Sequence, residues 1–468
     1  MAAIIDFLNT IFWNYILIYG LLAVGVYFTL RLGFIQVRRF PEFIRTVLKA
    51  PQSDRGGISP FQALCTSLAS RVGTGNMTGV AVALYLGGPG AIFWMWVVAI
   101  IGMATAYAES TLAQLYKMRD QNGQLRGGPA FYISKGLKAP WAGAVFSLAL
   151  ILAFGLVFNA VQANSIAGAM EGAFGIDTSV TGIVIMLLAA IVIFGGIKKI
   201  ARFAEIVVPF MAVLYLLLAL YVIFANISDV PAAFALIFKS AFGIEQAAGG
   251  VLGAMLNGVK RGLFSNEAGM GSAPNIAAVA TPNPHHPASQ GMVQSLGVFI
   301  DTLLICTATA LMILLSGALG NGQTGIALTQ TALTTHIGSA GHYFVAIAIF
   351  FFAFTSIIGN YSYAENALTY LKWANKPGIF ILRILALGMI PWGAYESVAM
   401  VFNAADAAMG LMATINLIAI MMLSGLVVKL TKDYFTQLKT HTPVFNSDDY
   451  PEVRDDIDLS VWDEKPSK

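Results

Sequence analysis

Charged residues are scarce in this 468-residue sequence. Asp, Glu, Lys and Arg together make up 11% of it, against roughly a quarter in a soluble domain. Apolar residues make up 57%. This balance excludes an ordinary soluble fold and predicts a polytopic membrane protein embedded in a lipid bilayer. The net charge of +3 gives no indication of a nucleic-acid partner.

Cysteine and histidine are also rare. The two cysteines, Cys65 and Cys306, fall inside apolar segments and are predicted to be small core residues, not a disulfide or metal pair. The five histidines form no helical pair with the spacing of metal ligands, so neither a transition-metal site nor a prosthetic group is predicted. A nucleotide phosphate loop is not visible, which argues against ATP as the energy source.

Long apolar segments, by contrast, are abundant. A helix needs roughly 20 apolar residues to cross the hydrocarbon core. No Lys or Arg precedes Arg31, so the first segment lacks the basic start of a cleaved signal and is expected to remain as a membrane helix. Eleven spans are predicted, at 14–31, 60–85, 90–116, 140–170, 179–197, 201–225, 246–280, 291–317, 342–371, 378–399 and 401–429.

Basic residues alternate between the loops. They follow the first, third, fifth, ninth and eleventh spans, as with Arg38 and Arg39, Lys135 and Lys138, or Lys429. The positive-inside rule therefore predicts an outer N-terminus and a cytoplasmic C-terminus. The amphipathic segment 34–50 is predicted either to lie in the inner membrane interface or to be a helical linker. The acidic tail from Thr440 is expected to be mobile.

Without the first span, ten remain, in two groups of five that each begin with an interrupted helix. Because five is odd, the second group has the opposite orientation, which is the inverted-repeat plan of many secondary transporters. The predicted fold is thus all-α. It divides into residues 1–58, an N-terminal span with a basic interfacial helix; 59–225 and 226–432, the two five-helix repeats; and 433–468, an acidic cytoplasmic tail.

The first interruption contains Gly73, Thr74, Gly75 and Asn76. In lipid, unwound backbone is tolerated only where it lines a cavity or holds a ligand. The N-terminus of a half-helix suits a carboxylate, and the C-terminus of the preceding half offers carbonyls to a cation. An amino acid together with Na⁺ would suit both ends. The alternative is that the two glycines simply allow close helix packing.

The second interruption spans Gly262 to Gly269 and contains Ser265, Asn266 and Glu267. An ionisable residue inside a membrane span is costly and usually functional. Glu267 is predicted either to cap the following half-helix or to contact the substrate. Phe264 is a candidate aromatic lid over the ligand, although a single aromatic residue in a span often only packs.

The motifs around both interruptions closely resemble those of the alanine/glycine:cation symporter family, also called sodium:alanine symporters. They are Gly73-Thr-Gly-Asn-Met with Gly79-Val-Ala, Gly87-Gly-Pro-Gly-Ala-Ile-Phe-Trp-Met-Trp, Arg126-Gly-Gly-Pro with Tyr132, and Arg261-Gly-Leu-Phe-Ser-Asn-Glu-Ala-Gly. The resemblance covers about residues 10–440. It implies import of alanine or glycine with Na⁺, on a fold like that of the bacterial leucine transporter.

This resemblance also implies roles for single residues. The amides of Thr74 and Gly75 would bind the substrate carboxylate, and carbonyls near Arg71 and Phe264 with the hydroxyl of Ser265 would bind its ammonium. The implied Na⁺ site lies between the carbonyls of Ala69 and Val72 and a later helix that offers the carbonyl of Phe352 and the hydroxyls of Thr355 and Ser356. Hard cations favour such oxygen ligands, but hydroxyls in helices more often bond a preceding carbonyl of their own helix.

Arg71 departs from the leucine-transporter pattern, which has a small residue at this position. A fixed cation there would repel or replace a second Na⁺, so one coupled Na⁺ is expected. Gln162 and Asn159, three residues apart on one helical face, are expected either to close the pocket or to bond a neighbouring span. The candidate substrate-binding residues are Thr74, Gly75, Asn76, Gln162, Phe264, Ser265, Asn266 and Glu267.

Lys260 and Arg261 need an acidic partner. Asp406, in the last span, is the candidate for an external gate, with Asp301 as its rival and a merely structural ion pair as the alternative to a gate. The predicted function is a Na⁺-coupled symporter in a bacterial-type inner membrane. The alternatives are an H⁺-coupled carrier with Glu267 or Asp301 as proton site, a channel, and a membrane enzyme using Glu109 and Asp301. The sequence offers no nucleophile and base pair for an enzyme.

Overall fold

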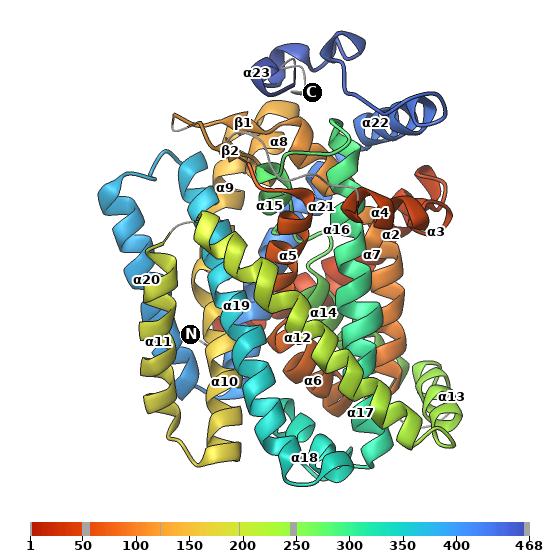
Figure 1. Cartoon of the computed structure of the whole chain (residues 1–468), viewed down its shortest axis with the longest axis vertical. Helices are drawn as coiled ribbons and strands as arrows, with labels where there is room; N and C mark the ends of the chain where they lie inside the picture. The colour runs from red at the N-terminus through yellow and green to blue at the C-terminus, as the bar shows by residue number, and fades with distance from the viewer. Residues whose placement is uncertain (1, 49–56, 122, 196, 244–249, 463–468) are drawn as a thin grey trace.

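The structure, a computed structural model, describes residues 2–48, 57–121, 123–195, 197–243 and 250–462. It is an almost entirely helical bundle, elongated along the direction of its long helices (Figure 1). Within the described residues, eight helical segments are long and apolar enough to cross a membrane: Ala3–Arg31, Gly90–Leu115, Pro140–Phe174, Glu205–Ala225, Pro287–Ser316, Ala340–Tyr370, Lys376–Tyr395 and Val398–Met422. The prediction of an integral, mainly α-helical membrane protein is confirmed.

Both interrupted spans fold as pairs of half-helices at the centre of the bundle. The first pair is α5 (Pro60–Arg71) and α6 (Val80–Gly87), and the second is α14 (Gly250–Asn266) and α15 (Pro274–Val279). In Figure 1, α5 and α15 lie above the interruptions and α6 and α14 below them, so the two interrupted spans run in opposite directions. The first four residues of the predicted span 246–280 lie outside the described residues.

Complete helices surround the half-helices. They are α1 (Ala2–Asn9), η1 (Thr10–Leu17) and α2 (Ile18–Arg31); α7 (Gly90–Leu115); α9 (Pro140–Leu150), η3 (Ile151–Val157) and α10 (Phe158–Phe174); α11 (Thr178–Ile193); α12 (Ile197–Ala225); α16 (Pro287–Val298), η4 (Phe299–Cys306) and α17 (Thr307–Ser316); α19 (Ala340–Tyr370); α20 (Lys376–Tyr395); and α21 (Val398–Met422).

Local sequence explains where several helices begin. Ser59 accepts the N–H of Gln62 at 3.1 Å, and the Gln62 side chain accepts the N–H of Ser59 in return, so α5 starts with a complete capping box before Pro60. Asp177 accepts the N–H of Ser179 at the start of α11, and Asn375 accepts the N–H of Gly378 at the start of α20. These caps fix the residues at which α5, α11 and α20 begin.

Glycine brings α14 against α7. A Cβ at Gly258 would collide with the backbone carbonyl of Ala91, and a Cβ at Gly262 would collide with the Val98 side chain. Because these positions have no side chain, α14 and α7 pack almost backbone to backbone.

Several local predictions were incomplete. Stretches expected to be plain loops contain α13 (Val230–Ala241), α18 (Gly325–Ile337) and a short hairpin of β1 (Met118–Arg119) and β2 (Leu125–Arg126). The last predicted span, 401–429, is two helices, because α21 ends at Met422 and α22 (Ser424–Gln437) begins as a separate helix. The amphipathic segment 34–50 forms α3 (Ile35–Arg38) and α4 (Phe40–Leu48), whose buried Phe43 and Val47 face the bundle.

The prediction of a mobile tail is wrong for residues 440–462. Phe445, Tyr450 and Trp462 are buried against the end of the bundle that carries β1, β2 and α8 (Pro129–Gly136) (Figure 1). Trp462 donates from Nε1 to the carbonyl of Leu115 at 3.2 Å. The composition of this tail is acidic, but its spaced aromatic residues bury apolar area, and that burial outweighs the charge.

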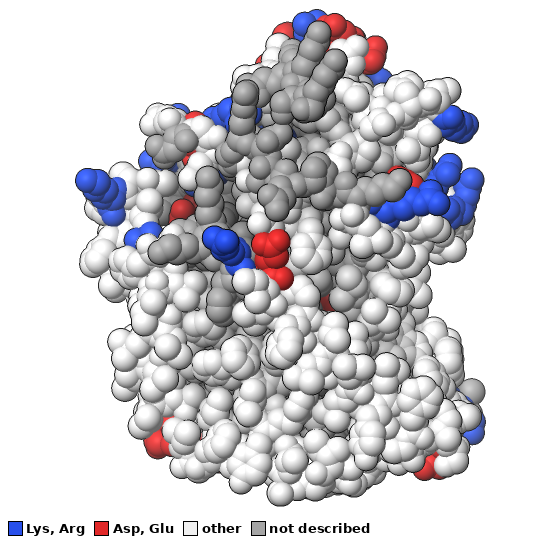
Figure 2. Space-filling view, viewed as in Figure 1, with Lys and Arg blue, Asp and Glu red and all other residues white. Residues whose placement is uncertain are grey.

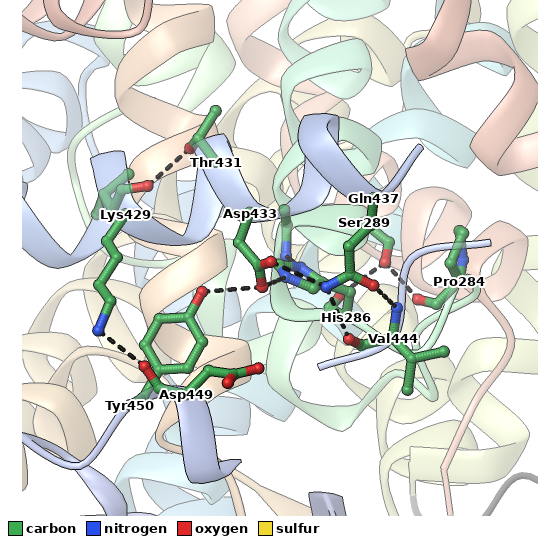
Figure 3. A network of polar contacts seen from close by, with 12 residues as sticks. Pro284, His286, Ser289, Lys429, Thr431, Asp433, Gln437, Val444, Asp449 and Tyr450 are labelled. Atoms are coloured by element: carbon green, nitrogen blue, oxygen red, sulfur yellow. Dashed lines mark hydrogen bonds and ion pairs between the residues drawn. The ribbon is translucent and has the colours of Figure 1, made fainter. Parts of the chain in front are cut away.

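Polar contacts also hold the tail in place, and Figure 3 shows Asp433 of α22 between two of its partners. Its Oδ2 lies 3.2 Å from Nε2 of His286 and accepts the Tyr450 hydroxyl at 3.0 Å. Lys429 reaches the Asp449 carbonyl at 2.9 Å. The tail therefore connects α22 to the loop before α16.

Candidate functional site

The first interruption falls at Val72 and Gly73, between α5 and the π-helical turn η2 (Gly75–Gly79). The N–H of Gly73 donates to Asn76 Oδ1 at 2.9 Å, and the N–H of Thr74 donates to Gln162 Oε1 at 3.0 Å. Two backbone donors of this interruption are thus bonded to side chains and not to carbonyls of a continuous helix. Each is satisfied by a side-chain oxygen in the structure.

The two glycines of this interruption allow side chains from three other helices to approach. A Cβ at Gly73 would collide with Ser356 Oγ and lie 2.8 Å from Gln162 Oε1, and a Cβ at Gly75 would lie 2.9 Å from the Cα of Ser265. Close packing and exposure of the backbone therefore occur together here. The two explanations considered for these glycines do not exclude each other.

The second interruption begins later than predicted. Gly262 to Asn266 remain helical in α14, and the chain leaves the helix at Glu267, whose φ is 59°. Gly269 and Gly271 also have positive φ, 90° and 85°, and α15 begins at Pro274. Ser265 and Asn266 thus project from the end of a half-helix. Asn266 Oδ1 accepts the N–H of Ala268 at 3.0 Å and so steadies the turn.

Asp301 joins the two interruptions. Its Oδ1 accepts from Asn76 Nδ2 at 2.7 Å, and its Oδ2 accepts from Ser265 Oγ at 2.8 Å. All three side chains are fully buried. Asp301 lies on the π-helical turn η4, and such turns occur often at functional sites. It was considered as a partner for Lys260 or Arg261, but it lies at the centre of the bundle instead.

Glu267 occupies the other side of the second interruption. It is buried, and its two carboxyl oxygens lie 2.9 Å from Ser70 Oγ and 2.5 Å from Ser272 Oγ. Its side-chain contacts are thus with hydroxyls of both interruptions. Glu109 of α7 supports the same turn, with Oε1 accepting the Gly269 N–H at 3.2 Å. The sequence marked Glu109 only as an acid inside a span, and its proximity to Gly269 could not be read from spacing.

The residues that the resemblance implies for Na⁺ lie where α5 meets α19. Ser356 Oγ is 3.4 Å from the carbonyl oxygen of Val72. Thr355 and Ser356 both donate to the carbonyl of Phe352, at 2.8 and 3.0 Å, as hydroxyls in helices often do. The Gly73 N–H, which would bond the Ala69 carbonyl if α5 continued, is given to Asn76 instead. Oxygen atoms of the buried residues Val72, Phe352, Thr355 and Ser356 thus lie close together at the end of α5.

Aromatic rings cover the end of α14. Phe264 stacks on Phe158 with centroids 4.9 Å apart and meets Phe402 at 5.3 Å. Phe158 and Phe402 were not singled out in the sequence, because aromatic residues in apolar spans are common. Gln162 extends from the same helix as Phe158 to the first interruption, whereas Asn159 donates to the Gly155 carbonyl and accepts from Asn360.

An ion-pair cluster lies beside Phe264 and Phe402. Asp406 contacts Arg261 directly, and Lys260 Nζ lies 3.7 Å from Asp406 Oδ2. The Arg261 guanidinium stands 4.9 Å from the centroid of Phe402. Of the two carboxylates considered as partners for these cations, Asp406 is the one that meets both.

Arg71 is buried, with its side chain directed toward α16. One of its guanidinium nitrogens donates to the carbonyl of Gln294 at 3.2 Å, in space left open by Gly297. It lies within electrostatic range of Glu109, Glu267 and Asp301. The fixed positive charge is therefore close to both interruptions, and Gln294 is its hydrogen-bond partner.

Comparison with known proteins identifies the class of transporter to which these motifs belong. The family model described as the sodium:alanine symporter family matches residues 1–447. A probable sodium/glutamine symporter GlnT of Bacillus subtilis is 51% identical over 95% of this chain and 93% of its own length. The sodium/alanine symporter AgcS of Methanococcus maripaludis is 41% identical, covering 92% of this chain and 97% of its own.

Solved structures show the fold. MhsT in complex with L-phenylalanine covers 88% of this chain and 95% of its own, with a TM-score of 0.57 at 15% identity. A manganese transporter of Eremococcus coleocola covers 81% of this chain and 80% of its own, with a TM-score of 0.52 at 13% identity. The fold resemblance to the leucine-transporter class is confirmed. The protein belongs to the sodium:alanine symporter family, whose members are cation-coupled amino-acid transporters.

Proposed function

We propose that this protein imports small neutral amino acids, alanine or glycine, together with Na⁺ by alternating access. The observation that carries the proposal is the meeting of the two interruptions. Gly75 lies against Ser265, and Asp301 bonds side chains from both sides. Buried backbone turned out of helical geometry at membrane depth, from two opposed half-helix pairs, is the arrangement in which secondary transporters hold substrate.

The substrate carboxylate would bind at the N–H groups of Thr74 and Gly75, where the helix dipole is positive. Gln162 Oε1 accepts the Thr74 N–H in the structure, so the substrate carboxylate would have to displace it. The ammonium would lie near the carbonyls of Arg71 and Phe264 and the hydroxyl of Ser265. Asn76, Asn266 and Glu267 would complete the polar wall.

Na⁺ would bind the carbonyls of Ala69, Val72 and Phe352 and the hydroxyls of Thr355 and Ser356. The 3.4 Å approach of Ser356 Oγ to the Val72 carbonyl supports this site, because both are oxygen ligands of the kind that a hard cation prefers. Each ligand would favour the closed arrangement of the bundle, so binding of one would strengthen binding of the other.

For the architecture we propose eleven spans, made of one extra helix and a 5+5 inverted repeat. The eight long helices, the shorter apolar helix α11 and the two half-helix pairs support this count. The opposite directions of the half-helix pairs support the inversion (Figure 1). The repeats would comprise residues 59–225 and 226–432, between the N-terminal segment of residues 1–58 and the tail of residues 433–468.

We further propose that the N-terminus lies outside and the tail in the cytoplasm, in a bacterial-type inner membrane. Figure 2 shows Lys and Arg gathered over the upper half of the molecule, where the tail and β1 lie, above a mostly uncharged surface. Positive charge on the cytoplasmic side favours this orientation.

The substrate is tested by uptake of labelled alanine into proteoliposomes, with and without Na⁺, in competition with other amino acids including glutamine. Phe264 packs against Phe158 and Phe402, and Gln162 reaches the first interruption, so a small substrate is expected. Alanine and glycine should compete, and leucine should not. Glutamine must be in the panel because one relative is named a probable sodium/glutamine symporter. Competition by glutamine but not by alanine would overturn the substrate proposal.

An H⁺-coupled carrier is the second candidate. YrbD of Bacillus subtilis, 43% identical over 95% of this chain, is named a putative sodium/proton-dependent alanine carrier, and buried acids lie at both interruptions. Undiminished uptake at fixed pH, with choline in place of Na⁺, would favour this candidate and contradict the Na⁺ proposal.

A further inference from the structure

A chain of side-chain hydrogen bonds leads from Gly155 to Glu267, and its directions can be assigned one by one. Asn159 Nδ2 lies 3.0 Å from the carbonyl oxygen of Gly155. A carbonyl only accepts, so this end of the Asn159 amide must be its nitrogen. Its oxygen therefore faces the next residue in the chain, Asn360, which lies 3.2 Å away and must present Nδ2.

The orientation of Asn360 then determines what Ser70 does. With Nδ2 given to Asn159, the amide oxygen of Asn360 is the atom that lies 2.7 Å from Ser70 Oγ. Ser70 has one hydroxyl proton, and this contact needs it. The remaining bonding capacity of Ser70 Oγ consists of lone pairs.

Glu267 Oε1 lies 2.9 Å from the same Ser70 Oγ. If Glu267 were ionised, its Oε1 could only accept a hydrogen bond, and it would face the lone pairs of Ser70 Oγ, whose proton is already donated to Asn360. The two oxygens would then repel each other. We propose that Glu267 is a proton-binding site of the transporter core: its carboxyl is neutral in this conformation and donates from Oε1 to Ser70 Oγ. The other oxygen, Oε2, accepts from Ser272 at 2.5 Å, as the carbonyl oxygen of a protonated carboxyl does.

The other two buried acids at the interruptions have the opposite pattern. Glu109 accepts the Gly269 N–H at 3.2 Å and Asn416 Nδ2 at 2.7 Å, and both are fixed donors. Asp301 accepts Asn76 Nδ2, whose orientation is set by the Gly73 N–H on Asn76 Oδ1. Both are therefore suited to the ionised state. Glu267 is the acid whose partners require a proton.

The groups that face Glu267 come from four elements. Arg71 of α5 is a cation, Asp301 of η4 and Glu109 of α7 are acids, and Tyr363 of α19 carries a phenol. With Glu267 neutral, the positive charge of Arg71 faces the two negative charges of Asp301 and Glu109. An ionised Glu267 would add a third negative charge. A proton on Glu267 thus stabilises the conformation in which α5 and the second interruption are joined through Ser70. Alkaline pH, which removes the proton, weakens that link.

Infrared difference spectroscopy on the purified full-length protein, titrated between acid and alkaline pH, tests the protonation directly. A carbonyl stretching band of a protonated carboxyl should appear at neutral pH, disappear in Glu267→Gln and persist in the matched control Glu109→Gln. A band that persists in Glu267→Gln, or its absence from the wild type, overturns the proposal. Should Glu267→Gln fail to fold, Ser70→Ala serves. The band should shift because the O–H loses its acceptor, and an unshifted band contradicts the assignment.

Uptake supplies a second test, which rests on the proposed function. Na⁺-dependent uptake of the wild type should decline on the alkaline side of its pH profile. In Glu267→Gln, whose amide cannot lose a proton there, the profile normalised to its own maximum should be flat over that range. An unchanged alkaline decline would overturn the proposal. The spectroscopic test needs no transported substrate, so its outcome is independent of whether alanine uptake is found.

Discussion

The ion pair between Arg261 and Asp406 gives the sharpest prediction. The two side chains are 3% and 5% exposed, so neither charge is screened by water. Replacing Asp406 with asparagine removes one charge and leaves the Arg261 guanidinium buried without it. Breaking a buried pair in this way costs about 3–5 kcal/mol. At 1.4 kcal/mol per factor of ten, the closed arrangement at this end should lose roughly 10²- to 4 × 10³-fold in population relative to the open one.

We therefore expect Asp406→Asn to impair Na⁺-driven uptake into proteoliposomes at least tenfold, while binding of labelled substrate to the purified protein stays measurable. The site itself, at the interruptions, is untouched. Lys260→Gln is the matched control. Lys260 lies 3.7 Å from Asp406 and its side chain is 16% exposed, so the loss of this contact should cost less than the loss of Asp406. Unchanged uptake in Asp406→Asn, or equal damage in Lys260→Gln, would show that the pair is not a gate.

Five further changes have defined outcomes. Ser356→Ala should raise the Na⁺ concentration for half-maximal uptake roughly tenfold or more, since it removes an oxygen beside the Val72 carbonyl; an unchanged Na⁺ dependence argues against this site. Gly73→Ala should cost about 1–3 kcal/mol in substrate binding by calorimetry, because its Cβ meets Ser356 and Gln162. Gly388→Ala on α20, which meets nothing within 4 Å, should be silent. Burial lowers the pKa of His286, whose Nδ1 accepts the Ala288 N–H. The folded state therefore binds this proton less readily than the unfolded chain, and tail docking should hold above about pH 6.5 and weaken below it, as followed by limited proteolysis of the tail. Trp462→Ala should release the tail to protease at neutral pH as well, whereas a resistant tail would mean that Tyr450 and Asp433 suffice.

The interruptions were predictable because polar, glycine-rich backbone in an apolar span has few explanations. The sequence placed Asn76, Ser265 and Glu267 at the centre of the molecule for this reason, and the structure brings them there. The exact start of the second interruption was not predictable. Gly262 is compatible with a helix when it packs on α7. The chain turns only at Glu267, the first of three residues with positive φ between 267 and 271.

Contacts between segments that are distant in the chain could not be predicted from the sequence. Asp301 is one acid in an apolar span, and spacing alone could not tell whether it would face Lys260 or Asn76. Its position depends on the π-helical turn η4, which rotates side chains relative to an ordinary α-helix and has no clear signature in composition. The docked tail was missed for a related reason. Its acidic composition suggested disorder. In the structure, three aromatic residues of the tail are buried against α7 and the loop before α16.

The glycine contact between α14 and α7 constrains how this molecule moves. With the carbonyl of Ala91 where a side chain of residue 258 would otherwise stand, the two helix backbones lie in close contact, and no layer of side chains separates them at this point. Helix α14 ends at the second interruption, so this contact links α7 to the centre of the bundle. We therefore expect a shape change that uncovers the centre of the bundle to move α7 and α14 together.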